Sequence, residues 1–164
     1  SIRRRQRQMC IRDRFDIDFA PLSLENLEQA RTTTLKLQNW IEKNYDYELI
    51  SISFSGSKGF HLFYHDLDRS LFSIENARER EHAVKAARNK LLQEVLLAGF
   101  KVDPRITADT RRIIRLPGSI HGKTGLLCHR ISLERLNKSV DSWIDQVPSF
   151  FGQLEMPKLS RIHI

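Results

Sequence analysis

The sequence has few of the residues that mark specialised protein classes. Its 164 residues include seven glycines, five prolines and two cysteines, Cys10 and Cys128. Low glycine and proline content argues against collagen-like and disordered chains, and two cysteines cannot build a disulfide framework. Two free thiols are typical of a reducing compartment. No apolar run approaches the roughly 18 residues that cross a bilayer. The length and composition are those expected of one globular domain.

The positive charge is concentrated at the N-terminus. Residues 1–14 hold six arginines and one aspartate, and therefore five of the seven net positive charges. This segment is either a disordered arm that binds phosphates or, as we favour, a non-native run that resembles translated sequencing adapter. A secretory signal is excluded because no apolar stretch follows the arginines. Residues 15–164 carry a net charge of only +2. This small charge does not indicate that these residues bind DNA strongly on their own.

Hydrophobic periodicity predicts a mixed α/β (α+β) domain in the order β-α-β-β-α-β-β-α. We expect one compact core over residues 15–150, with a mixed or antiparallel sheet flanked by helices, and a tail over 151–164. Ser23 and Ser73 are expected to cap two long helices that end near Asn44 and Gly99. The other expected elements are strands at 15–19, 50–54, 60–64, 112–116 and 125–131, with the last two paired, and a helix near 133–147.

Two carboxylates stand on one face of the first expected strand. Asp16 and Asp18 alternate with Phe15, Ile17 and Phe19. Two unit charges about 4 Å apart repel by roughly 4 kcal/mol at an effective dielectric of 20, so such a pair favours a bound divalent cation. An exposed acidic strand face would show the same pattern.

A glycine-rich turn follows the second expected strand. Residues 55–59 read Ser-Gly-Ser-Lys-Gly, and His61 follows on the returning strand. Glycines let the backbone approach a ligand, while Ser55, Lys58 and His61 supply donors to an anion. Strand alternation places His61 on the face expected for Asp16 and Asp18. An ordinary hairpin turn with a surface lysine is the alternative.

A third cluster of charged residues spans 103–125. It contains Asp103, Asp109, Arg115 and His121 among further basic residues. A solvated, charged strand and loop is again the simpler interpretation of this segment alone.

Taken together and in order, these segments resemble the catalytic small subunit of archaeo-eukaryotic primases. The similarity is carried by FDID at 15–18, SGSKGFHLF at 55–63 and VDPRITADTRRIIRLPGSIHGKTGL at 102–126. It implies an archaeal-type DNA primase catalytic core, a template-directed nucleotidyltransferase that makes short primers on single-stranded DNA. It also implies a large-subunit partner, nucleoside triphosphates as substrates and a cytoplasmic, nucleoid-associated location, or a nuclear one in a eukaryote.

The resemblance assigns a role to each candidate residue. Asp16, Asp18 and Asp103 match the carboxylates that hold two Mg²⁺ or Mn²⁺ ions, with Asp109 a rival for the third place. Nucleotide phosphates are expected to bind the residues that match the hairpin and basic motifs: Ser55, Lys58, His61, Arg115 and His121.

The chain also departs from the family pattern. Small subunits commonly carry a zinc knot and a sizeable region before FDID; we expect no zinc site here, and a truncated fragment. Two other functions stay open: a primase-polymerase or end-joining repair polymerase that extends existing ends, and a non-catalytic nucleic-acid-binding remnant. Three carboxylates argue against the remnant, because binding phosphates requires cations.

Overall fold

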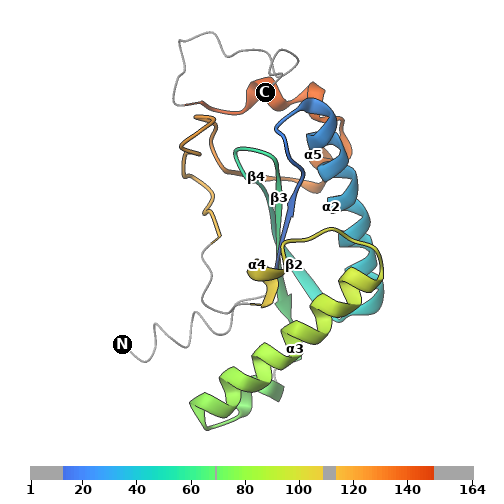
Figure 1. Ribbon diagram of the computed structural model, residues 1–164, viewed down its shortest axis with the longest axis vertical. Coiled ribbons are helices and arrows are strands. Elements are labelled where there is room, and N and C mark those ends of the chain that lie inside the picture. The colour runs from blue at the N-terminus through green and yellow to red at the C-terminus, as the bar shows by residue number, and fades with distance from the viewer. Residues whose placement is uncertain (1–12, 69, 109–113, 150–164) are drawn as a thin grey trace.

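A four-stranded antiparallel sheet organises the molecule (Figure 1). The computed structural model describes residues 13–68, 70–108 and 114–149. The strands lie in the order β1-β3-β2-β4, so β3 and β2 are central. Their bounds are Arg14–Asp18 for β1, Tyr47–Phe54 for β2, Gly59–Asp66 for β3 and His129–Ile131 for β4. The predicted mixed α/β class, with a sheet flanked by helices, is confirmed.

The period-two pattern of β1 is realised as predicted. Phe15 and Ile17 are fully buried, whereas Asp16 and Asp18 belong to the opposite strand face. Pairing with β3 sets Asp16 opposite His61. The apolar side chains therefore anchor the strand in the core while the carboxylates leave it.

A bulge interrupts the pattern of β2. The register with β3 shifts between Leu49 and Ser51, which leaves Ile50 as the extra residue. Ile50, Ile52 and Phe54 alternate with serines in the sequence, which is the pattern that predicts this strand, yet the exposed fraction of Ile50 is 41%. Ile50 departs from the pattern because a bulge changes which residues face the core.

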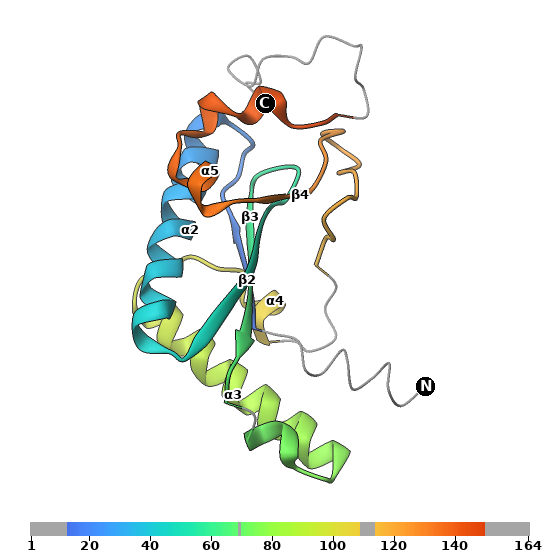
Figure 2. The same ribbon diagram turned by 180° about the vertical axis from the view of Figure 1, so that it is seen from behind.

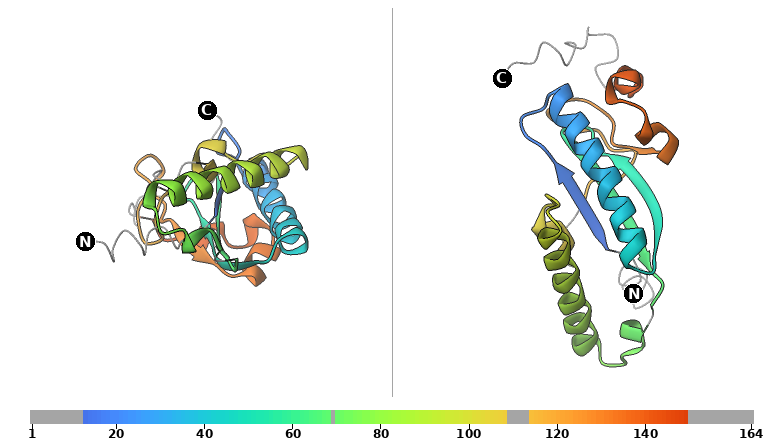
Figure 3. Two further views of the ribbon diagram at one scale, coloured as in Figure 1. Left: turned by 90° about the horizontal axis from the view of Figure 1, so that it is seen from below. Right: turned by 90° about the vertical axis from the view of Figure 1, so that its right-hand side faces the viewer.

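Helix α2 (Leu24–Asn44) packs lengthwise against the sheet (Figure 3). Ser23 caps it as predicted, since its hydroxyl accepts a 3.1 Å hydrogen bond from the Asn26 N–H. The side chains that it buries are Leu27, Ala30, Thr34, Leu37, Gln38 and Ile41. The helix covers one face of the sheet, and residues 114–126 run along the other side (Figure 1).

The second long helix begins later than expected. Ser73 ends a short 3₁₀ helix (Ser70–Ser73), and the side chain of Asn76 caps α3 (Ala77–Leu97) instead. The N-cap prediction for Ser73 was therefore wrong, because the chain makes a separate turn before the helix starts. No helix within the described ranges is long and apolar enough to cross a bilayer.

The C-terminal part pairs differently from the prediction. Residues 114–116 form no strand, and β4 pairs with β2 instead. The predicted pairing of 112–116 with 125–131 is wrong over the part that can be compared, since residues 109–113 lie outside the described residues. Two isolated bridges, Ile120 with Leu127 and Leu126 with Ser149, take its place.

Short helical segments complete the core beside α2 (Figure 2). Instead of one helix near 133–147, the chain forms α5 (Leu133–Asn137) and two 3₁₀ turns, Val140–Ser142 and Ile144–Gln146. Trp143 packs edge-on against Phe54 and Phe60 with ring centroids 6.0 and 6.3 Å apart. These contacts close the core under the hairpin of β2 and β3.

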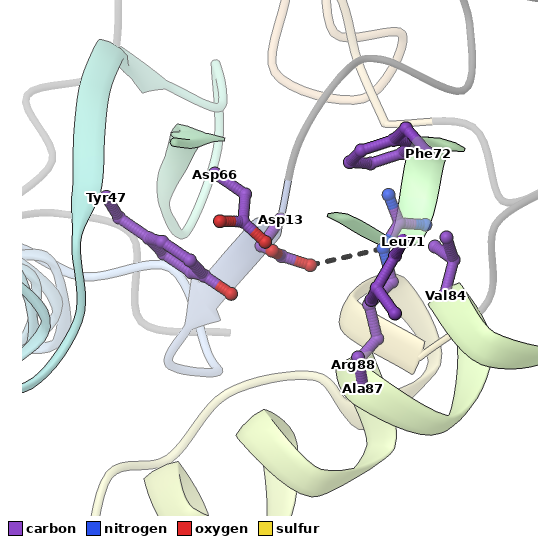
Figure 4. A pocket seen from close by; sticks show the side chains of 8 residues that line it. All are labelled: Asp13, Tyr47, Asp66, Leu71, Phe72, Val84, Ala87 and Arg88. Atoms are coloured by element: carbon purple, nitrogen blue, oxygen red, sulfur yellow. Dashed lines mark hydrogen bonds and ion pairs between the residues drawn. The ribbon is translucent and has the colours of Figure 1, made fainter. Parts of the chain in front are cut away.

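A buried ion pair ties the start of β1 to α3 (Figure 4). Arg88 Nε lies 3.1 Å from Asp13 Oδ1, and each side chain is 9% exposed. Tyr47 and Asp66 point toward Asp13 from the neighbouring strands. Asp13 and Arg14 fall within the N-terminal segment 1–14 expected from the sequence, yet Asp13 forms this ion pair and Arg14 begins β1. Residues 1–12 lie outside the described part.

We predict that Asp13→Ala lowers the free energy of unfolding by about 3 kcal/mol, because it leaves the Arg88 charge buried without this partner. Urea denaturation provides the measurement. Glu134→Ala is the matched control, since it breaks a 3.1 Å pair with Lys138 that is exposed to solvent and is expected to cost less than about 1 kcal/mol. An equal loss of unfolding free energy in both variants would show that the Asp13–Arg88 pair stabilises the fold no more than an exposed pair does.

Candidate active site

A polar cleft of about 210 Å³ lies where β1, the 55–59 turn and residues 114–121 meet. All eight predicted site residues except Asp103 line it. The sequence did not predict Ser57, Ile106 and Ile114 as part of this lining. Apolar wall residues such as these isoleucines carry no chemical signal in the sequence.

The pairing of β1 with β3 builds the floor of the cleft. Asp16 Oδ1 lies 3.6 Å from His61 Nε2, and Asp18 Oδ2 lies 3.7 Å from Lys58 Nζ. Gly59 faces Asp18 across the ladder, and a Cβ on it would lie 1.8 Å from the Ile17 carbonyl oxygen. Glycine is therefore required here by the close approach of the two backbones.

Asp16 occupies an unfavourable electrostatic position. Burial first, and then the neighbouring charges of Asp18 and Asp103, raise the pKa of its carboxyl from 3.8 to about 7. Lys58 and Arg115 offset part of this increase. Its buried Oδ1 has no hydrogen-bond partner. A buried carboxylate oxygen without a donor is suited to a cation that shares the site.

His61 is neutral beside it. Burial, and secondly the charge of Arg115, lower the pKa of the imidazole to about 4. Between these two pKa values neither His61 nor Asp16 is charged, so their 3.6 Å contact is not an ion pair there. The neutral ring can donate a hydrogen bond without adding charge to the cleft.

Asp103 is next to Asp16 but does not line the cleft. Its N–H donates a 2.9 Å hydrogen bond to the Asp16 carbonyl, and its Oδ1 accepts one of 2.8 Å from Arg105 N at the start of α4 (Pro104–Ala108). Within the described ranges, no three His, Cys, Asp or Glu side chains are placed to hold a metal ion. The carboxylates Asp16 and Asp18 thus share the cleft, while Asp103 acts on it through its charge. Asp109 lies outside the described residues.

The 55–59 turn is organised by its own first hydroxyl. Ser55 Oγ accepts hydrogen bonds from the N–H groups of Ser57, at 3.3 Å, and Gly59, at 3.2 Å. Its own proton stays available to a ligand in the cleft. The side chains of Ser55, Ser57 and Lys58 thus enter the cleft from one tight turn.

The opposite rim comes from the basic loop, which we define as residues 114–126. Arg115 Nη1 is buried and has no hydrogen-bond partner. His121 Nδ1 accepts 3.3 Å hydrogen bonds from the N–H groups of Lys123 and Thr124. These bonds leave Nε2 as the protonated nitrogen of the neutral ring, and burial and Arg115 lower the pKa of His121. Both residues therefore present donors from this loop.

Comparison with known proteins identifies the family of the chain. Residues 15–133 match the family model described as DNA primase small subunit. The chain belongs to the DNA primase small subunit family. The matched range contains β1 from Phe15 onward, β2, β3, β4, the turn and the basic loop. The family resemblance predicted from the three motifs is confirmed.

Relatives are found among archaea. A DNA primase small subunit of Pyrobaculum aerophilum is 29% identical over 158 residues, covering 79% of this chain and 51% of its own. The one from Haloarcula marismortui is 45% identical over 62 residues, covering 37% and 16%. An uncharacterised DNA primase small subunit-like protein of Archaeoglobus fulgidus is 30% identical over 139 residues, covering 85% and 44%. The chain thus spans about half the length of the curated relatives that it matches.

We predict that Asp16→Asn stabilises the metal-free fold by on the order of 2 kcal/mol above pH 7. The folded state holds the Asp16 proton more tightly than the unfolded state, because its pKa is raised from 3.8 to about 7. The Asp16 contribution to stability is therefore lost as the pH rises through this interval, and Asn avoids the loss.

The measurement is the difference in free energy of unfolding between variant and wild type, from pH 4 to 8 with a chelator present. Taking the difference removes the opposite contribution of His61. Asp145→Asn, at an exposed position, is the control and should change the free energy of unfolding by less than about 0.5 kcal/mol. A flat difference for Asp16→Asn would show that its carboxyl is not strained by burial.

Proposed function

We propose that this chain carries the nucleotidyl-transfer site of a DNA primase small subunit, which copies single-stranded DNA into short primers. The observation that supports this most is the single cleft that brings Asp16 and Asp18 together with Lys58, Arg115 and His121. A carboxylate pair that shares a cleft with the positive charges of Lys58 and Arg115 is suited to a nucleoside triphosphate that binds together with divalent cations.

Asp16 and Asp18 would hold Mg²⁺ or Mn²⁺, with Asp103 as the proposed third carboxylate. The unpartnered Asp16 Oδ1 and its raised pKa fit this role, since a cation replaces a proton at a crowded carboxylate. Oxygen ligands of this kind are those that hard divalent cations prefer. When bound, such ions stabilise negative charge on the attacking 3′-oxygen and on the leaving pyrophosphate.

The protein's own residues bind and orient the triphosphate. Ser55 and Lys58 contribute donors from the turn, and Arg115 and His121 from the basic loop, so the phosphates are held from two sides. Neutral His61 donates a hydrogen bond beside the carboxylates. Catalysis is then mainly positioning together with electrostatic stabilisation of phosphate charge.

Single-stranded DNA and a primase large subunit are the proposed partners. The small net charge of residues 15–164 supports the need for a partner in template binding. This replication role would place the protein with DNA in an archaeal-type cytoplasm.

We predict that the chain incorporates labelled nucleotides on an unprimed single-stranded DNA template with Mg²⁺ or Mn²⁺. The double variant Asp16→Asn/Asp18→Asn should lose this activity by more than about 100-fold, because it removes both carboxylates from the cleft. Asp141→Asn/Asp145→Asn, two exposed aspartates outside the cleft, is the matched control.

Short products on the unprimed template from the wild type and the control, but not from Asp16→Asn/Asp18→Asn, would support primer synthesis. Incorporation only on a primed template would indicate an end-extending polymerase instead. Equal incorporation by the Asp16→Asn/Asp18→Asn variant would contradict the assignment of these carboxylates.

We also predict that Arg115→Ala raises the apparent KM for the nucleotide about 10- to 100-fold, since a charge-assisted donor to phosphate is lost. The measurement is nucleotide-dependent primer synthesis at saturating template. Arg130→Ala, an exposed arginine on β4 outside the cleft lining, controls for the loss of one positive charge. An unchanged KM in Arg115→Ala, or an equal rise in both variants, would rule out a specific role for Arg115.

A further inference from the structure

A hydroxyl group beside the cleft joins its two sides. Thr124 Oγ1 donates a 2.5 Å hydrogen bond to the carbonyl of Gly56 and accepts a 3.2 Å bond from the Leu126 N–H. The first bond connects the 55–59 turn to the basic loop across 68 residues of sequence. Thr124 does not line the cleft itself.

Gly56 shows how closely the turn approaches this loop. Its φ is +79°, which L side chains rarely adopt, and an added Cβ would lie 2.8 Å from the Leu126 carbonyl oxygen. The same Cβ would lie 3.2 Å from the N of Cys128 and 3.2 Å from the Cβ of His121. The turn therefore rests directly on the backbone that follows Thr124 and on His121 of the basic loop.

The same stretch of backbone also orients His121. The Thr124 N–H is one of the two donors to His121 Nδ1, and the His121 N–H donates to the Leu126 carbonyl at 2.9 Å. Thr124 thus contacts the turn through its side chain and His121 through its backbone. Moving this residue would change the spacing of both sets of phosphate donors.

We propose that Thr124 is a positioning residue that fixes the distance between the turn bearing Ser55 and Lys58 and the loop bearing Arg115 and His121. A ligand that must contact both sides then binds without first ordering them, which reduces the entropy cost of binding. The identity of that ligand, a nucleoside triphosphate, rests on the proposed function. The Thr124–Gly56 hydrogen bond that fixes this distance is present in the free chain.

The test compares Thr124→Val, which replaces the hydroxyl by a methyl group, with Thr124→Ser, which keeps it. Thr32→Val is the matched control, because Thr32 Oγ1 donates a 2.8 Å bond to the Glu28 carbonyl within α2, away from the cleft. Affinity for a fluorescently labelled nucleoside triphosphate with Mn²⁺ should fall about tenfold in Thr124→Val, as expected for one lost, partly buried hydrogen bond. Thr124→Ser and Thr32→Val should stay within about twofold of wild type.

A second readout requires no ligand. The N–H groups of Ser57 and Gly59 are held by Ser55 Oγ inside the turn, so hydrogen exchange at these amides reports its order. We expect their exchange to quicken about tenfold in Thr124→Val and to stay unchanged in Thr124→Ser and Thr32→Val.

Unchanged exchange and affinity in a folded Thr124→Val variant would overturn the proposal. So would a Thr124→Ser variant as impaired as Thr124→Val, because the hydroxyl would then not be responsible. If Thr124→Val does not fold, Thr124→Ala replaces it, with the same expectations. If exchange is faster in Thr124→Val but the wild-type chain binds no nucleoside triphosphate, the positioning role of Thr124 is supported and the proposed function is rejected.

Discussion

The antiparallel pairing of β1 with β3 is the constraint on which the candidate active site depends. It sets Asp16 opposite His61 and Asp18 opposite Gly59, so both carboxylates lie beside the 55–59 turn that leads into β3. The pairing is stabilised from the other face by Phe15 and Ile17, which are fully buried. Because side chains alternate along a strand, the residues that anchor β1 also direct its aspartates into the cleft.

The cleft combines groups that do not stabilise one another well. Asp16 is partly buried next to other acidic groups, and its buried Oδ1, like Arg115 Nη1, has no hydrogen-bond partner. Buried polar atoms of this kind reduce fold stability, and they cluster where a protein binds charged ligands. In the proposed site, divalent cations would satisfy the carboxylates and phosphates would satisfy the arginine, so ligand binding would relieve both deficits.

Local patterns in the sequence predicted the parts of the fold that depend on neighbouring residues. Strand alternation gave the faces of β1 and placed His61 with Asp16, and Ser23 was identified from its position before a helix. The failures involve information that is distant in sequence or hidden in backbone geometry. The bulge that exposes Ile50, the extra turn that moves the cap from Ser73 to Asn76, and the pairing of β4 with β2 have no signal in local periodicity.

Asp103 and Thr124 show the same contrast between what local sequence patterns predict and what contacts in the folded chain determine. The side chain of Asp103 is directed to the start of α4 by a hydrogen bond that spacing to the basic loop does not reveal. The importance of Thr124 appears only when Gly56 lies beside it, 68 residues away in sequence.

Calorimetric titration of a nucleoside triphosphate into the chain, with Mn²⁺ and then with a chelator, measures whether the carboxylates and the basic side chains act as one site. If they do, binding should require the cation, and Asp16→Asn should lose the cation dependence together with most of the affinity. Equal affinity in Mn²⁺ and in chelator would show that the carboxylate pair plays no part in holding the triphosphate, and would contradict the account.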